Sequence, residues 1–233
     1  TRDLHDRLDL APLDGESIEP SVRLHLGLRA TAETHRWDAI ATRCWPECFT
    51  DYGGAACTAQ AALSSACGVP ALCEADAYGA ITALLLGRLA GADPFVADLV
   101  DLDPASDTGA VWHCGLAPWS MADPATPPRG ARHPNRGLPL LNEFALRAGT
   151  VTIARLSQSR HHLRLLVGRG ELLAAPRPFS GTSGTLRFEQ PVDAVLDTIA
   201  TEGLEHHYGI VHGDVRDDLV GVAALLGLPV IEL

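Results

Sequence analysis

The stretch Gly68–Asp103, GVPALCEADAYGAITALLLGRLAGADPFVADLVDLD, decides the fold. Two short apolar runs, Val69–Cys73 and Pro94–Leu102, flank a longer apolar segment that begins at Asp76 and continues to about Leu89. Short apolar runs that alternate with helical patterns are typical of βα units around a mostly parallel sheet. We therefore predict a strand, a helix and a second strand, with Asp76 at the N-cap or in the first turn of the helix.

The same alternation extends toward the N-terminus. Helical patterns cover Ser17–Thr34 and Ala55–Ala66, and a short apolar run covers Asp38–Cys44. Glu74 then follows the C-terminal end of a predicted strand, which is where open α/β sheets usually bind ligands. Residues 1–92 are therefore predicted to form an α/β domain.

The chain changes character after Asp103. Period-2 patterns separated by turn residues predict the strands of an antiparallel barrel or sandwich at Ala110–Cys114, Gly149–Leu156, His162–Val167, Glu171–Ala174 and Thr185–Phe188. Two helices and two further strands are predicted at Val192–Glu202, His206–Val211, Asp214–Leu226 and Pro229–Glu232. Asp214 is expected to cap the last helix and Gly227 to end it. Residues 93–233 should thus form a mostly antiparallel, β-barrel-like domain, and the chain is α+β overall.

Composition excludes several classes of function. The chain has 233 residues, of which 46% are hydrophobic, and a formal net charge of −11, which repels nucleic-acid phosphates and anionic membrane. Its longest apolar stretch, Ala80–Ala90, is interrupted by Arg88 and is too short to cross a bilayer. All 18 basic residues are arginines, so Schiff-base chemistry and a Walker-A nucleotide site are excluded. We expect a soluble protein with no nucleic-acid or membrane partner.

Six cysteines lie in the first half of the chain, at positions 44, 48, 57, 67, 73 and 114. No signal peptide precedes them, so reduced thiols in the cytoplasm are expected. Cys44 and Cys48 lack a second ligand pair at zinc-site spacing, which favours small buried side chains over a structural zinc site. The chain begins at Thr1 without an initiator methionine, which indicates a fragment or a processed product.

Carboxylate and imidazole groups that could converge come from four segments. Asp98 lies in a run of hydrophobic residues and needs a cation, hydrogen bonds or solvent, although it could also simply cap a turn. His206 and His207 are consecutive in a predicted strand, so only one of them should face a given site. His212 lies at a strand-to-helix junction, where it could be catalytic or an exposed turn residue.

Five motifs together resemble the second half of the L-fucose/L-arabinose isomerase family: RCWPE at 43–47, CEADAYGA at 73–80, FVADLV at 95–100, WHCG at 112–115 and HHYGIVHGDVRDDLVGVAALLGLPV at 206–230. The resemblance covers residues 37–233. It implies an Mn²⁺ site, with Mg²⁺ as the alternative ion, whose ligands are Glu74, Asp98 and His207, with His113 as a fourth ligand. It also implies that an N-terminal domain is missing and that the protein forms homo-oligomers, as trimers or hexamers.

The resemblance implies an aldose–ketose isomerase that acts on a deoxy-hexose or pentose through a cis-enediol. Glu74 and Asp98 would transfer protons, and a divalent cation would stabilise the charge on adjacent substrate oxygens. The candidate sugar contacts are Trp45, Glu47, Trp112 and His206. A sugar- or metal-binding relative without catalysis, and a metal-dependent aldolase or epimerase, remain alternatives. The segments HPNRG at 133–137 and GTSG at 181–184 receive no role.

Overall fold

A closed β-barrel lies in the C-terminal part of the chain. The computed structural model describes residues 2–233, and the side chains of all of these except Arg2, Asp3 and His5. Six strands pair in the order β8, β7, β10, β3, β4 and β9, all antiparallel, and the pairing of β8 with β9 closes the ring. These strands are β3 (Phe95–Asp103), β4 (Thr108–His113), β7 (Gly149–Ser157), β8 (Arg164–Leu172), β9 (Thr182–Phe188) and β10 (His207–His212). The prediction of an antiparallel barrel in the C-terminal part is confirmed.

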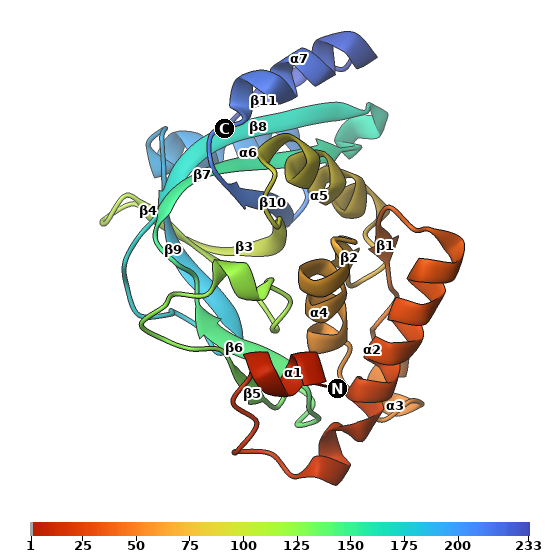
Figure 1. Cartoon of the computed structure of the whole chain (residues 1–233). Coiled ribbons are helices and arrows are strands. Elements are labelled where there is room, and N and C mark those ends of the chain that lie inside the picture. The colour runs from red at the N-terminus through yellow and green to blue at the C-terminus, as the bar shows by residue number, and fades with distance from the viewer. Residues whose placement is uncertain (1) are drawn as a thin grey trace.

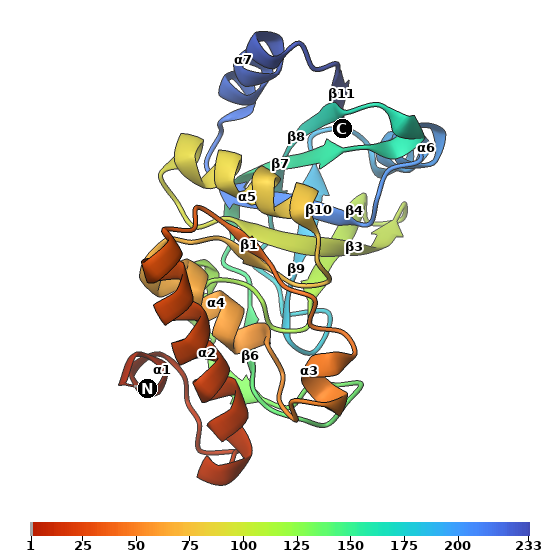
Figure 2. The same ribbon diagram turned by 90° about the vertical axis from the view of Figure 1, so that its right-hand side faces the viewer.

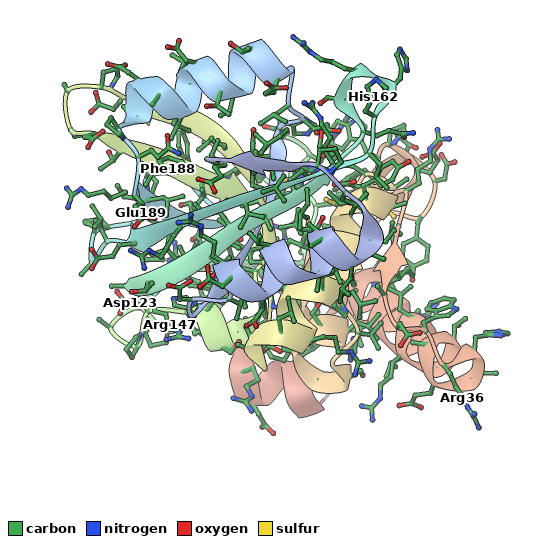
Figure 3. All side chains as sticks on the ribbon, turned by 90° about the horizontal axis from the view of Figure 1, so that it is seen from above. Arg36, Asp123, Arg147, His162, Phe188 and Glu189 are labelled. Atoms are coloured by element: carbon green, nitrogen blue, oxygen red, sulfur yellow. The ribbon has the colours of Figure 1, made fainter. Side chains whose placement is uncertain are left out.

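Three short strands extend the barrel, and two helices flank it. β11 (Val230–Glu232) pairs in parallel with β8, while β6 (Leu141–Ala145) pairs in parallel with β9 and carries β5 (Arg129–Ala131) on its other edge. Figure 3 shows α6 (Val192–Glu202) and α7 (Arg216–Leu226) on either side of the barrel strands. Phe95, Ile153, Leu166 and Ile210 from four different strands belong to the largest hydrophobic cluster. Their neighbours Ala154, Leu165, Val167 and Val211 pack in a second cluster with Leu219 and Ala223 of α7, so both faces of these strands are apolar.

Helices fill the N-terminal part, which lies to one side of the barrel (Figure 1). They are α1 (Arg2–Arg7), α2 (Gly15–His35), α3 (Glu47–Thr50), α4 (Cys57–Cys67) and α5 (Ala77–Ala90), and two short 3₁₀ turns occur later in the chain at Trp119–Met121 and Ser159–His161. Among the residues that the structure describes, no helix is long and apolar enough to cross a membrane.

The predicted parallel sheet is wrong in extent. Only β1 (Ile40–Ala41) and β2 (Ala71–Leu72) pair in parallel, two residues each. The strand predicted at Pro94–Leu102 exists as β3, but it joins the antiparallel barrel. An apolar run does not identify its partner strand, and here the partners come from the C-terminal part of the chain. The molecule is mixed α+β, and the domain boundary at residues 92 and 93 stays a prediction.

Two of the three residues predicted to cap or end a helix do so. Asp76 is the N-cap of α5, as predicted, and its carboxylate accepts the Gly79 N–H at 2.8 Å. Gly227 ends α7 with a left-handed φ of 65°, also as predicted. Asp214 is not the cap of α7, because the helix starts at Arg216 with Val215 in the N-cap position. The Asp214 carboxylate instead binds Arg169 at 3.0 Å.

Close contact between α5 and the barrel depends on a glycine in β10. A Cβ at Gly209 would lie 2.8 Å from Leu86 Cδ1 and 2.8 Å from Thr82 Cγ2, both on α5. We expect Gly209→Val to lower the free energy of unfolding by about 1–3 kcal/mol, because overpacking displaces α5 from β10. Denaturant titration measures this change. Gly221→Val is the control, since nothing lies within 4 Å of its Cβ position, and an unchanged midpoint for Gly209→Val would contradict the tight contact.

Candidate functional site

A cleft of about 530 Å³ opens beside the barrel strands β3 and β4. Figure 2 shows α3 below these two strands on the same side of the molecule. The lining comes from distant parts of the sequence and includes the segment after β1, the end of β2, the end of β4 and the loop before β6. The thiol, carboxylate and imidazole side chains in this lining are Cys44, Cys57, Cys73, Glu74, Asp98, His113, Cys114 and His133.

Asp98 and His207 form the centre of the site. They are direct partners in the antiparallel pairing of β3 with β10, and Asp98 Oδ1 lies 3.2 Å from His207 Nε2. Both atoms are buried, and among the described residues neither has a hydrogen-bond partner of good geometry. Leaving two facing polar atoms without partners is costly, so this arrangement requires a cation or a proton between them.

Glu74 reaches the same point from the other wall of the cleft. Its Oε2 lies 3.8 Å from His207 Nε2, and its side chain is 46% exposed. The backbone of Glu74 and of Ala75 is in the left-handed region, with φ of 58° and 56°, which is unfavourable for residues with a Cβ. Backbone strain of this kind concentrates at functional sites.

His206 also approaches these carboxylates, which corrects the expectation that only one of the two neighbouring histidines faces the site. Its Nε2 lies 3.7 Å from Glu74 Oε2 and 3.6 Å from Asp98 Oδ1. The alternation of faces holds only within a strand, and β10 begins at His207. His206 lies just before it, so its ring turns back toward His207, with 4.3 Å between the ring centroids.

Asp76 orients His207, a role that the sequence did not reveal. Asp76 Oδ2 lies 2.9 Å from His207 Nδ1, and Arg155 binds the same carboxylate through both terminal nitrogens at 2.5 and 3.0 Å. Although burial opposes ionisation, the hydrogen bonds from His207, Arg155 and Gly79 hold the pKa of Asp76 well below its usual range. An ionised Asp76 only accepts hydrogen bonds, so Nδ1 of His207 carries a proton. In the neutral ring, Nε2 is then free to bind a cation.

The same carboxylates control the protonation of His207. Burial lowers its pKa, but the hydrogen bond to Asp76 and the nearby negative charge of Asp98 outweigh burial and raise the pKa to about 9. Either a proton on Nε2 or a metal cation at the same place would provide a partner for both His207 Nε2 and Asp98 Oδ1. The surroundings of these two atoms therefore stabilise a positive charge.

His113 makes different contacts. Its Nδ1 accepts the Cys114 N–H at 2.9 Å, so in the neutral ring the proton sits on Nε2, which lies 2.9 Å from the Cys73 sulfur. Asp98, His113 and His207 offer ligand atoms within 4.8 Å of one another. Ligation by His113 Nε2 would require it to give up the contact with Cys73, and its role as a fourth ligand stays a prediction.

Two of the three remaining predicted sugar contacts line the cleft. Trp45 is 41% exposed there, and the Arg136 guanidinium lies 4.0 Å above its ring. Trp112 also lines the cleft, and its indole N–H donates to the Ser180 carbonyl at 2.5 Å. Among the residues that the structure describes as lining the cleft, Glu47 is absent. Its carboxylate pairs with Arg43 at 2.6 Å.

His212 lies at the far end of β10. Its Nε2–H donates to the Arg147 carbonyl at 3.1 Å, and burial lowers its pKa. The segments 133–137 and 181–184, to which the sequence assigns no role, lie in different places. His133 and Asn135 of the 133–137 segment line the cleft, whereas in the 181–184 segment Thr182 starts β9.

Three overlapping groups of described residues could hold a metal ion, each with ligand atoms within 4.8 Å. They are Glu74, His206 and His207; Asp98, His113 and His207; and Cys73, Glu74 and His113. Glu74, His113 and His207 each belong to two of them. The predicted ligands therefore converge on one place, which does not establish the identity of the ion.

Comparison with known proteins identifies relatives. No family model matches the chain. A sulfoquinovose isomerase from Alkalicoccus urumqiensis is 36% identical over 221 residues, which cover 94% of this chain and 50% of that protein. Sulfoquinovose isomerases from Priestia megaterium and Clostridium sp. are 33% and 34% identical, over 91% and 89% of this chain and 48% and 46% of their own lengths. The chain thus spans about half the length of the curated relatives that it matches.

These relatives correct the resemblance inferred from the motifs. The curated proteins that match most of this chain are named sulfoquinovose isomerase, and not L-fucose or L-arabinose isomerase. A motif match is a hypothesis with a risk of false positives, and a match over most of the chain outweighs it. The assignment to the L-fucose/L-arabinose family is wrong, while the general class of a sugar isomerase agrees with the relatives.

Proposed function

We propose that this chain carries the metal site and the acid–base carboxylates of an aldose–ketose isomerase. The name of its relatives suggests that the substrate is sulfoquinovose. One observation carries the proposal: the buried Asp98 Oδ1 and His207 Nε2 face each other at 3.2 Å without partners among the described residues. Asp76 orients the ring of His207 so that Nε2 can bind a cation. Beside this pair lies a cleft large enough for a sugar.

The donor set fits a divalent cation. Glu74 and Asp98 supply carboxylate oxygens and His207 an imidazole nitrogen, a set that suits Mn²⁺ or Mg²⁺ better than a structural zinc ion. When bound, the ion supplies electrophilic stabilisation of the charge that develops on two adjacent sugar oxygens. We propose Mn²⁺ as the ion, with Mg²⁺ as the alternative.

The two carboxylates have unequal surroundings, which suggests different roles. Asp98 is held in the barrel with 15% of its side chain exposed, next to His207. Glu74 is 46% exposed and extends into the open cleft from a strained turn. We assign Glu74 as the group that moves the proton between C1 and C2, because it is the more exposed of the two carboxylates and lines the open cleft. Positioned proton transfer of this kind contributes about 10²–10⁴-fold to the rate.

The cleft walls would hold the sugar. Trp45 and Trp112 offer apolar faces, and His206 adds a polar ring beside the carboxylates. The trimeric or hexameric assembly expected from the sequence stays a prediction. Because the chain spans about half of its relatives' length, the activity named for them comes to this chain only as a proposal.

Removal of divalent cations tests the proposal. Treatment of the protein with EDTA followed by desalting is expected to abolish conversion of sulfoquinovose to its ketose, and added Mn²⁺ should restore it. Ketose formation is followed by chromatography, and Ca²⁺ is the control ion, because its larger, flexible coordination shell suits this site poorly. Full activity after metal removal would contradict the metal-dependent mechanism.

The alternative is a sugar- or metal-binding protein without catalysis. Its supporting observation is the length of the match, because the half of the relatives that this chain does not span could hold groups that the reaction needs. A binder would retain Mn²⁺ and sugar in equilibrium dialysis while producing no ketose.

A further inference from the structure

We propose that the guanidinium of Arg136 forms an anion subsite at the end of the cleft away from the metal site, where it binds the sulfonate group of the sugar. This inference rests on the proposed function, because sulfoquinovose is a six-carbon sugar with a sulfonate on C6. The reaction takes place at C1 and C2, so the sulfonate lies at the other end of the open-chain sugar. The segment 133–137, to which the sequence assigns no role, thereby receives one.

Two separate groups of aromatic and imidazole rings lie along the cleft. In the group at the metal site, neighbouring ring centroids are 4.3 to 6.1 Å apart, and its members are Trp112, His113, His206 and His207. In the other group the centroids are 4.8 to 6.1 Å apart, and its members are Trp45, Phe49 and His133. Among the described residues no ring contact joins the two groups, although both contribute to the cleft lining. The second group therefore marks the end of the cleft away from the metal site.

Arg136 places a positive charge at this second end. Its guanidinium carbon lies 4.0 Å from the centroid of the Trp45 ring, which is a cation–π contact. Arg136 is exposed, and within residues 2–233 no carboxylate forms an ion pair with it. The ring thus holds the guanidinium in place without neutralising its charge.

The turn that carries Arg136 is held by its own hydrogen bonds. The His133 carbonyl accepts the Gly137 N–H at 2.8 Å, and the His133 N–H donates to the Leu138 carbonyl at 2.8 Å. His133 Nδ1 also accepts the Asn135 N–H at 3.3 Å, and the ring is buried against the second ring group. Gly137 closes the turn with a left-handed φ of 67°. A cation on such a turn is ordered before a ligand arrives, which lowers the entropic cost of binding.

The two other arginines near this turn already have anionic partners. Arg43 lines the cleft, but its guanidinium lies 2.6 Å from the Glu47 carboxylate. Arg132 lies 3.4 Å from the Asp14 carboxylate and donates to a carbonyl of the turn. An anion that bound either of them would compete with a carboxylate. Arg136 is therefore the guanidinium that is available to a substrate anion.

The chemistry of the two groups is complementary. A guanidinium offers a planar pair of N–H donors, and this pair matches two oxygens of one anionic group in a bidentate contact. A neutral sugar such as glucose has a hydroxyl on C6 and gains no charge-assisted contact there. The subsite therefore favours sulfonated sugars over neutral ones by a difference in affinity.

Measurement of sugar binding tests the subsite without requiring turnover. Equilibrium dialysis with Mn²⁺ present gives the affinities for sulfoquinovose and for glucose. We expect Arg136→Gln to weaken sulfoquinovose binding about 10–100-fold, the contribution of a charge-assisted hydrogen bond, and to leave glucose binding unchanged. Arg136→Lys keeps the charge but loses the planar donor pair, so its affinity should lie between the two.

Salt dependence and a distant arginine separate this effect from a structural one. Added salt should weaken sulfoquinovose binding to the unaltered protein more than to Arg136→Gln, because the variant lacks the charge that salt screens. A disordered turn would instead weaken both sugars equally. Arg88→Gln is the control, since Arg88 is an exposed arginine in a different pocket, and its sulfoquinovose affinity should not change. Circular dichroism checks that each variant is folded.

The outcomes distinguish the subsite from the isomerase. Unchanged sulfoquinovose affinity in Arg136→Gln, a larger loss in Arg43→Gln, or equal affinity of the unaltered protein for sulfoquinovose and glucose would overturn the subsite. Tighter binding of glucose 6-phosphate than of sulfoquinovose would overturn its assignment to a sulfonate. If sulfoquinovose binding depends on Arg136 but no ketose forms, the isomerase fails and the subsite stands. If ketose forms and Arg136→Gln has an unchanged KM, the isomerase stands and the subsite fails.

Discussion

The His207→Ala variant is expected to bind Mn²⁺ about 100-fold or more weakly than the unaltered protein, because loss of a ligand costs at least as much as the loss of a group that orients one. His207 Nε2 is the nitrogen that faces both Asp98 and Glu74. Titration followed by electron paramagnetic resonance of free Mn²⁺ measures the affinity without requiring turnover.

The matched control is His212→Ala. His212 lies at the other end of the same strand, and its ring nitrogen donates to the Arg147 carbonyl instead of facing the cleft. Its removal should leave Mn²⁺ affinity unchanged. Equal affinity of the His207→Ala variant and the unaltered protein would show that the ion, if one binds, is held elsewhere.

The Asp76→Ala variant is expected to lose both metal affinity and stability. Without the carboxylate, His207 Nδ1 has lost its acceptor, and groups that orient a ligand typically contribute about 10–100-fold to metal affinity. Arg155 has only 5% of its side chain exposed and would lose its bidentate partner. Breaking a buried ion pair from one side costs about 3–5 kcal/mol, so the free energy of unfolding should fall by this amount.

Asp14→Ala separates this effect from the loss of a helix cap. Asp14 is the N-cap of α2 and accepts the Ser17 N–H at 2.7 Å, as Asp76 does for α5. Its removal should cost about 1 kcal/mol and leave Mn²⁺ affinity unchanged. If both variants lose the same small amount of stability and neither changes metal affinity, Asp76 is only a cap.

Helices were predictable from the sequence because their signals are local. Asp76 and Gly227 mark helix ends within a few residues of the pattern that they close, and α6 has the predicted bounds Val192–Glu202. Strand partners were not predictable in the same way. β3 looks like a strand of a parallel sheet, yet its neighbours are β10 and β4, and the partner strand β10 is more than a hundred residues away in sequence.

Asp76 and Arg155 show why part of the site was missed. They are 79 residues apart, and the capping role of Asp76 gave a sufficient local reason for a carboxylate at that position. A signal was nevertheless present, since Arg155 is a charged residue within the apolar run VTIARLS of β7. A buried arginine needs an anionic partner, and that requirement could have prompted a search for one.

The convergence of Glu74, Asp98 and His207 depends on contacts that a linear pattern does not contain. The pairing of β3 with β10 places Asp98 beside His207, and the turn after β2 brings Glu74 to the same point. Short motifs suggested these residues through a family assignment that the relatives overturn. The proposed site now rests on the geometry of the cleft and on the orientation of His207 by Asp76.

Hydrogen exchange at C2 of the sugar tests the isomerase proposal most directly. The protein is incubated with sulfoquinovose and Mn²⁺ in deuterium oxide, and the recovered sugar is analysed by proton magnetic resonance and mass spectrometry. Proton transfer through a cis-enediol by Glu74 predicts that deuterium enters at C2, and that Glu74→Gln abolishes this exchange while the variant remains folded. Formation of ketose without any deuterium in either sugar, or unchanged exchange in Glu74→Gln, would contradict the account.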